Sequence, residues 1–258
     1  MRNNLGYKIA IAVLTLIIIL EGAFIIMTRP RKIPGIPLAI KGKIAIVLDD
    51  WGYNLNNLEA LGRIKYPLTV AVLPRLSYSR VIASLLHGRG LEIILHLPME
   101  PREKYRLEKN TIMTYFNKED VENIINDDLT SIVYAKGVSN HMGSYATQNS
   151  GTMETVFKNL KRRNLYFLDS VVSSQSVCSD LARRMGLGFI KRDVFLDNKE
   201  EAAYIRGQIH KLKLVARVKG QAIGIGHDRR LTLEVLKEAM PELEKEGYKL
   251  VFVSELVR

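Results

Sequence analysis

Residues 44–54 read IAIVLDDWGYN, and this stretch decides how the rest of the chain is interpreted. The apolar run 44–48 is short and rich in β-branched residues, which is typical of a strand buried on both faces of a parallel sheet. It ends in Asp49 and Asp50, and adjacent carboxylates at the end of a buried strand repel each other. The stretch therefore predicts either a solvated turn or a site that holds a positive charge.

Short apolar runs recur after this stretch and alternate with segments of helical periodicity. This alternation predicts an α/β fold with a parallel sheet, arranged as a barrel or as a doubly wound layer. The expected strands span residues 43–48, 68–73, 91–97, 135–142, 165–169, 188–193, 222–227 and 249–254. The expected helices span residues 55–63, 79–89, 118–133, 152–163, 177–185, 200–219 and 232–246.

Asp and His residues lie at or near the ends of most of these expected strands. Because the carboxyl ends of parallel strands form the functional face of α/β folds, we expect these side chains to share one rim. One such residue alone would mean little, but a set of them predicts a functional site. The set comprises Asp49, Asp50, His96, His141, Asp169, Asp193 and His227.

The Asp pair and the histidines suit metal-assisted acid–base chemistry. One carboxylate can ligate a divalent metal while its neighbour accepts a proton from water. His96 and His141 are candidate ligands, and His227 is a candidate catalytic residue. Each of these residues has a structural alternative. The Asp pair can form a turn or a helix N-cap, and His96 can be a core histidine. His141 can lie in a glycine-rich turn, and His227 can lie near a helix N-cap.

Three carboxylates are candidates for supporting roles. Asp169 and Asp193 can each orient a histidine by accepting its second ring proton, pair with a neighbour such as Arg192, or serve as structural hydrogen-bonded carboxylates. Glu100 can point into the same cleft as His96 or be a solvated loop residue. The two remaining histidines, His87 and His210, lie in helical patterns among basic residues, and we interpret both as surface residues.

The N-terminal region predicts a membrane anchor. Residues 9–27 are apolar over about the length that spans a bilayer as a helix, and the basic residues before them predict a cytoplasmic start for residues 1–8. We favour an uncleaved, single-pass signal anchor in the inner membrane over a cleaved signal peptide. Residues 28–42, rich in Pro, Gly and basic residues, read as a linker to a domain spanning residues 43–258 that faces the periplasm or cell exterior.

Composition limits the classes of partner. The 258 residues carry a formal net charge of +11, but the basic residues are scattered and show no known nucleic-acid motif. We therefore expect no nucleic-acid partner. The single cysteine, Cys178, excludes an internal disulfide.

Six motifs, in this order, resemble those of the divergent polysaccharide deacetylase family, a distant relative of the NodB-type carbohydrate esterases. They are IVLDDWG, LEIILHLPMEP, GVSNHMGS, FLDS, RDVFLDN and IGIGH. The resemblance extends from about residue 43 to the C-terminus. It implies a distorted (β/α) barrel of seven or eight mostly parallel strands.

The resemblance also implies a role for each site residue. Asp49 matches the catalytic base and Asp50 the metal ligand of the NodB-type Asp pair, and His227 lies in the motif that supplies the general acid. His96 matches the first histidine of an H-x-x-x-H motif, but Glu100 stands where the second would be. The resemblance suggests that His141 supplies the missing imidazole. The implied cofactor is Zn²⁺, although the same donors accept Co, Ni, Mn or Fe.

The leading hypothesis is a membrane-anchored hydrolase that removes acetyl groups from an N-acetylated cell-envelope polysaccharide, with peptidoglycan as one candidate. The altered second motif keeps an alternative open, a glycan- or metal-binding domain of the same fold without turnover. A third hypothesis is a metal-dependent hydrolase of another substrate, such as a phosphoester.

Overall fold

The computed structural model describes residues 4–28 and 40–257, and its contacts divide the chain into two units, Met1–Leu38 and Ala39–Arg258. The described part of the first unit is the helix α1 (Asn4–Thr28), which has no buried residue. This helix is long and apolar enough to cross a membrane, and it includes the expected span 9–27. Most of the expected linker, residues 29–39, lies outside the described residues.

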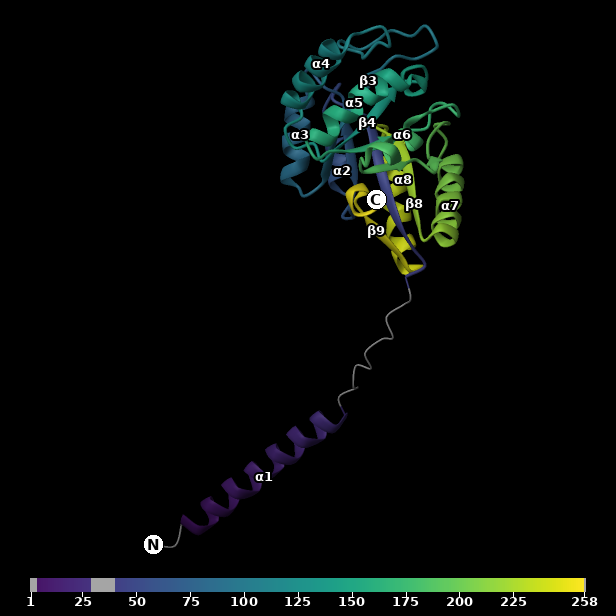
Figure 1. Cartoon of the computed structure of the whole chain (residues 1–258). Helices are drawn as coiled ribbons and strands as arrows, with labels where there is room; N and C mark the ends of the chain where they lie inside the picture. The colour runs from purple at the N-terminus through teal and green to yellow at the C-terminus, as the bar shows by residue number, and fades with distance from the viewer. Residues whose placement is uncertain (1–3, 29–39, 258) are drawn as a thin grey trace. The chain divides into compact units, whose positions relative to one another are not determined.

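The second unit is built on one parallel sheet with the strand order β6-β5-β4-β3-β2-β1-β8-β7, and β9 also pairs with β1 (Figure 1). Strand β1 is central because it pairs with β8 along one edge and with β9 and then β2 along the other. The strands are β1 (Gly42–Trp51), β2 (Thr69–Val72), β3 (Glu92–Met99), β4 (Gly137–Met142), β5 (Tyr166–Asp169), β6 (Phe189–Lys191), β7 (Val194–Phe195), β8 (Gln221–His227) and β9 (Tyr248–Val251).

The sheet curls until its two edge strands nearly meet. Strands β6 and β7 lie at opposite ends of the strand order, yet only Arg192 and Asp193 separate them in the sequence. The backbone N–H of Arg192 donates to Asp169 O of β5 (3.0 Å), and that of Asp193 donates to Ile223 O of β8 (2.9 Å). The predicted distorted barrel is therefore confirmed. The additional strand is β7, whose two residues are too few to give a periodic pattern.

Helices surround the sheet, and alternate strand residues face them or the barrel interior. On β1, Ile44, Ile46 and Leu48 join the large core under the helices, whereas Ala45 and Val47 join a smaller interior core. The interior core fills the barrel below the carboxyl ends of the strands. The helices are α2 (Leu58–Gly62), α3 (Ser79–Gly88), α4 (Lys118–Ser131), α5 (Ser150–Arg162), α6 (Cys178–Met185), α7 (Ala202–Lys219) and α8 (Arg230–Lys245), with short 3₁₀ turns η1 (Ala146–Gln148) and η2 (Val253–Glu255).

Candidate active site

The same alternation carries several polar residues into the barrel interior above that core. Asp49 continues the inward positions of Ala45 and Val47 on β1. His227 pairs in register with Asp49 on the neighbouring strand β8. On the other side, His96 of β3 pairs with Ser139 of β4, so these two side chains also face inward.

Asp50 reaches the same site because strand β1 is irregular at this point. In a regular strand the side chain after Asp49 would point to the opposite face. Instead, the pairing of β1 with β2 shifts register between Leu48 and Trp51, and Asp50 adopts a left-handed φ of 66°. As a result, both carboxylates lie near the same nitrogen: His96 Nε2 is 3.1 Å from Asp50 Oδ1 and 3.7 Å from Asp49 Oδ2.

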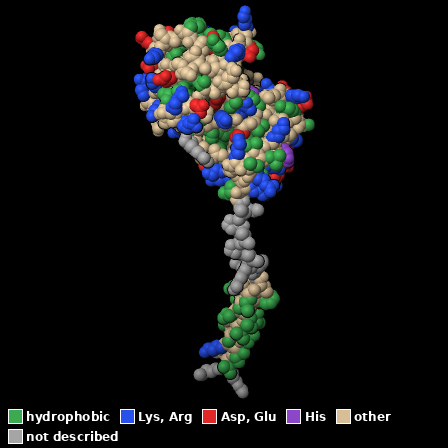
Figure 2. Space-filling view, turned by 45° about the vertical axis from the view of Figure 1, so that its right-hand side comes forward, with side chains coloured by type: hydrophobic (Ala, Val, Ile, Leu, Met, Phe, Trp, Pro, Cys, Tyr) green, Lys and Arg blue, Asp and Glu red, His purple; other side chains and the backbone are tan. Residues whose placement is uncertain are grey.

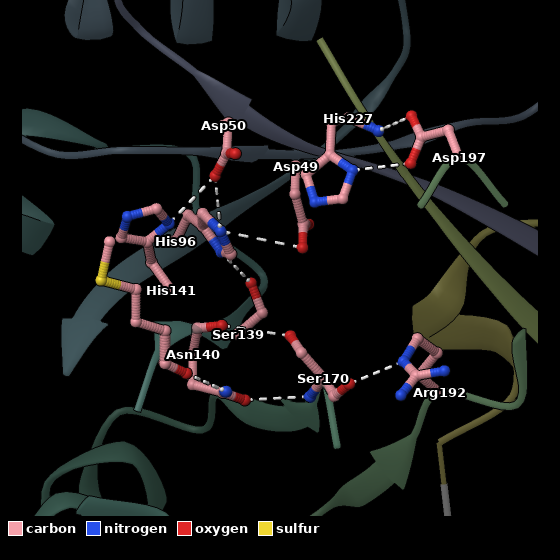
Figure 3. Close-up of polar contacts among 11 residues, drawn as sticks. Asp49, Asp50, His96, Ser139, Asn140, His141, Ser170, Arg192, Asp197 and His227 are labelled. Atoms are coloured by element: carbon pink, nitrogen blue, oxygen red, sulfur yellow. Dashed lines mark hydrogen bonds and ion pairs between the residues drawn. The ribbon is translucent and has the colours of Figure 1, made fainter. Parts of the chain in front are cut away.

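Asp50, His96 and His141 form a cluster with the composition of a metal site (Figure 3). His141 Nδ1 lies 3.0 Å from Asp50 Oδ1, and the rings of the two histidines meet edge to face with centroids 4.9 Å apart. One ligand atom from each of the three residues lies within 4.8 Å of the others. Two imidazoles and a carboxylate are the donors that catalytic zinc sites use, with a further position left for water.

Ser139 orients the His96 ring through a contact with the ring nitrogen that does not face the carboxylates. Its Oγ lies 2.8 Å from His96 Nδ1, on the ring edge opposite the carboxylates. When Nδ1 carries the ring proton and donates to Ser139 Oγ, Nε2 keeps its lone pair for a ligand. Sequence reasoning missed Ser139, although its position in the SNHM motif, two residues before His141, places it on the same strand face.

The charges of the cluster are coupled. Burial raises the pKa of Asp50, but hydrogen bonds with His141 and His96 outweigh burial and hold that pKa far below its usual range. Burial lowers the pKa of His96, but the nearby carboxylates of Asp49 and Asp50 outweigh burial and raise it. The anionic pair is thus stabilised by positive charge at this point, a role that suits a divalent cation.

Asp49 is enclosed within the site, between His96 and His227. Its side chain is buried, and no described group hydrogen-bonds to its Oδ1. Burial raises the pKa of this carboxyl, and the attraction of His96 offsets only part of that effect. An unpartnered buried carboxylate oxygen is costly unless a ligand supplies the missing partner. The arrangement around Asp49 therefore fits a cation and a bound water.

His227 lies on the opposite side of Asp49 and is held by Asp197, which follows β7. Asp197 Oδ1 is 2.7 Å from His227 Nδ1, and Oδ2 accepts hydrogen bonds from the His227 N–H (2.8 Å) and from Thr232 Oγ1 (2.7 Å). Burial lowers the pKa of His227, but the hydrogen bond with Asp197 outweighs burial and raises it. Sequence reasoning missed Asp197, which stands in the RDVFLDN motif just after a strand that was not expected.

Arg192, which lies between β6 and β7, binds the segment that follows β5. Arg192 Nε donates to Ser170 O (2.6 Å) and Nη2 donates to Val171 O (2.9 Å), as Figure 3 shows for Ser170. Its guanidinium lies 3.7 Å above the centroid of the Phe195 ring, which in turn stacks on His227 with centroids 5.9 Å apart. Phe195 therefore packs against one face of the His227 ring, and Arg192 packs against Phe195.

The three expected supporting carboxylates form hydrogen bonds with groups other than the site histidines, and for Asp169 and Asp193 this geometry fits the structural alternative rather than the orienting role. Asp169 accepts hydrogen bonds from Val171 N (2.8 Å) and Ser176 Oγ (2.7 Å). Asp193 accepts from Ile223 N (2.9 Å) and Lys219 Nζ (2.8 Å). Glu100 Oε2 accepts from Thr114 N (2.6 Å), outside the ligand cluster.

These carboxylates are therefore used to fix strand ends and loops. Asp197 is the carboxylate that orients His227, and neither Asp169 nor Asp193 takes that position. His87 and His210 are both exposed on the helices α3 and α7.

Comparison with known proteins agrees with this geometry. Residues 46–257 match the model of a family described as divergent polysaccharide deacetylase. The chain is 39% identical over 204 residues to the uncharacterized protein YibQ of Escherichia coli (strain K12). That alignment covers 79% of this chain but 64% of the relative, so the chain spans a little under two thirds of the relative's length.

Two solved structures share the fold. An uncharacterized protein from Agrobacterium tumefaciens C58 has a TM-score of 0.81 at 23% identity, covering 87% of this chain and 92% of that one. A family 4 carbohydrate esterase from Streptomyces lividans, in complex with acetate, has a TM-score of 0.53 at 14% identity, covering 83% and 93%. Together with the family match, these findings establish that the chain belongs to the divergent polysaccharide deacetylase family.

Proposed function

We propose that this protein is a metal-dependent hydrolase that removes acetyl groups from an N-acetylated cell-envelope polysaccharide, with peptidoglycan as the leading candidate. The observation that carries the proposal is the convergence of three metal-type donors on one side of buried Asp49, with the His227–Asp197 pair on the other. A base, an acid and a cation site around one point are the parts that amide hydrolysis requires.

In this proposal Asp50, His96 and His141 hold the cation, which we propose to be Zn²⁺. When bound, such a cation acidifies a water and polarises the acetamide carbonyl. The chain's contribution is to present one carboxylate and two imidazoles at fixed orientation, with Ser139 directing Nε2 of His96 toward the site.

Asp49 and His227 carry the proton transfers. Asp49 accepts a proton from the attacking water, and its raised pKa brings it closer to the operating pH, which favours a general base. His227 donates a proton to the departing amine, and its raised pKa keeps that proton available. Asp197 holds the His227 ring with Nε2 free to face the substrate.

The family and the fold support the substrate class. The family description names polysaccharide deacetylation, and the Streptomyces lividans esterase of the same fold was crystallised with acetate, the expected product. We further propose that α1 is an uncleaved anchor in the inner membrane and that the domain faces the periplasm or cell exterior, where envelope glycans are found.

One observation favours a second candidate, a domain that binds glycan or metal without turnover. Glu100 stands where the NodB-type enzymes resembled by the sequence have their second histidine ligand, and its carboxylate holds Thr114 N rather than the cluster. The site then depends on His141, from another strand, for its second imidazole.

Metal content and acetate release test the two candidates together. The full chain, purified in detergent without added metal and then supplied with zinc, should hold about one equivalent, the stoichiometry of a three-ligand catalytic site. His96→Ala and His141→Ala should lose the metal, whereas His210→Ala, on exposed α7, should keep it.

Acetate release from acetylated oligosaccharides separates the candidates. Turnover by the metal-loaded wild type supports the hydrolase, and bound metal without release from any acetylated chain supports the binding domain. Absence of metal in the wild type after zinc is supplied would overturn the metallohydrolase proposal. A parallel screen of phosphoesters tests the remaining alternative.

A further inference from the structure

Exposed tyrosines gather on one side of the barrel rim. Five tyrosines with exposed fractions between 39% and 74% lie on the segments that follow β1, β2, β3 and β4. Three of these strands, β1, β3 and β4, supply Asp50, His96 and His141. Among the described residues of the domain, the other exposed tyrosine is Tyr134, at the opposite end of the strands. The five are Tyr53, Tyr78, Tyr105, Tyr115 and Tyr145.

A cavity of about 580 Å³ is formed by segments that follow β1, β2 and β3, and Tyr53 is the tyrosine of this group that lines it. It is lined by Tyr53, by residues 74–77 after β2 and by residues 106–109 after β3. Tyr53 comes three residues after Asp50. Burial and the hydrogen bond with Glu108 raise the pKa of the Tyr53 hydroxyl, and the charge of Asp50 raises it further. That hydroxyl donates a hydrogen bond to Glu108, which ties the far wall of the cavity to the end of β1.

The cavity carries excess positive charge. Its charged lining residues are Arg75, Arg106, Lys109 and Glu108. Arg75 is neutralised by Asp127 (2.7 Å) and Asp128 (3.1 Å), and Glu108 accepts from Tyr53. Within the described ranges, Arg106 and Lys109 form no ion pair within 4.0 Å. Two cations therefore remain available to a ligand at the rim.

We propose that this cavity is a subsite for an anionic sugar unit that adjoins the N-acetylated sugar at the Asp50–His96–His141 cluster. The inference rests on the proposed function and deepens it by naming the substrate class as a carboxylate-bearing glycan. The Tyr53 ring offers a flat apolar face for a sugar ring, and Arg106 and Lys109 offer charge-assisted hydrogen bonds to its carboxylate. Ligand sites combine such aromatic surfaces with a few convergent polar groups.

Two oligosaccharides of equal length test the subsite. One is a chain of N-acetylglucosamine, which is neutral; the other is a peptide-free chain in which N-acetylmuramic acid alternates with N-acetylglucosamine and adds carboxylates. Calorimetry on the zinc-loaded full chain in detergent micelles gives the affinity for each, and acetate release gives kcat/KM.

The wild type should bind the anionic chain more tightly. The double variant Arg106→Gln/Lys109→Gln should lose about tenfold in affinity for the anionic chain, the scale of two exposed charge contacts, and keep its affinity for the neutral chain. The matched variant Arg217→Gln/Lys249→Gln removes the same charges at the amino ends of the strands and should change neither affinity. Added salt should shrink the preference in the wild type.

A second pair of variants isolates the ring. Tyr53→Ala should weaken binding of both chains, and Tyr53→Phe, which loses only the hydroxyl bond to Glu108, should weaken them less. Equal affinities of the wild type for both chains, or an equal loss in the matched control, would overturn the subsite while leaving the hydrolase proposal intact. Preference for the anionic chain without acetate release from either would instead support the subsite and count against the hydrolase.

Discussion

At Asp50 a single backbone angle determines which groups can meet. A left-handed φ of 66° is uncommon for a residue other than glycine, although Asp and Asn adopt it more readily than most. With this angle, two consecutive carboxylates face His96, although strand alternation would separate them. The strain of that geometry is offset by the hydrogen bonds of Asp50 with His96 and His141.

Substitution of Asp49 and substitution of Asp50 should have different effects on kcat and on zinc content. Asp49→Asn removes the proposed base but keeps a side chain of the same size, so we expect kcat for acetate release to fall by about 10²–10⁴-fold, the usual contribution of a general base. Zinc content, measured by atomic absorption, should stay at the wild-type value. Asp50→Asn should lower both. Loss of metal in Asp49→Asn would instead place Asp49 among the ligands.

The pH dependence of kcat should reveal the effect of Asp197 on the pKa of His227. In the proposed mechanism His227 must be protonated to act as an acid, and the hydrogen bond with Asp197 raises its pKa. Activity should therefore persist above the ordinary histidine pKa and fall as pH rises through the raised value. In Asp197→Asn the carboxylate is lost and burial acts against the charged ring, so the alkaline limb of the kcat profile should move to lower pH. A Thr232→Val variant, which removes a bond to Asp197 but keeps the charge, should shift the limb less.

At the scale of elements, most of the fold could be predicted from apolar runs and their ends. The run 44–48 and the strands carrying His96, His141 and His227 have enough residues to show a pattern, and the polar residue at or near the end of each one marks the candidate functional rim. Strand β7 has two residues and no such pattern, so Asp197 behind it was not recognised. The redirection of Asp50 depends on a φ angle, which residue type alone does not fix.

Two glycine substitutions, one in β8 and one in α7, should have opposite effects on the free energy of unfolding. A Cβ added at Gly226 in β8 would lie 2.9 Å from Thr232 Cγ2 and 3.4 Å from Asp197 Oδ2, so Gly226→Ala should lower the free energy of unfolding by about 1–3 kcal/mol through overpacking. Gly207 lies within α7 with no atom within 4 Å of such a Cβ, so Gly207→Ala should raise it by about 0.5–1 kcal/mol.

Denaturant unfolding followed by circular dichroism, with the full chain in detergent micelles, measures both changes. Both variants add one methyl group. If an added methyl group had a general effect, the free energy of unfolding would change in the same direction in both variants. Destabilisation of Gly207→Ala would show that α7 needs flexibility at that position.

At the scale of the whole molecule, the two units have different surfaces. Figure 2 shows hydrophobic side chains covering much of α1, whereas Lys, Arg, Asp and Glu are interspersed over the visible face of the domain. The helix has no buried residue, so its large apolar surface would be stabilised by an apolar partner. A lipid bilayer supplies such a partner, and 25 helical residues are sufficient to span it.

The anchor can be tested by placing charge at different depths in α1. Ile17→Lys/Ile18→Lys puts two ammonium groups near the middle of the helix, at a cost of about 2.5–3.5 kcal/mol each in a bilayer, and should move the protein out of the membrane pellet after alkaline extraction. Met27→Lys/Thr28→Lys puts the same groups at the helix end, where they reach the interface, and should leave the protein in the pellet.

Intact mass spectrometry of the wild type decides between anchor and signal peptide, because a cleaved chain lacks the mass of α1. A wild-type protein that is soluble and lacks this mass would refute the anchor, whereas full mass in the pellet, with the domain digested by protease added to the periplasmic side, would support it.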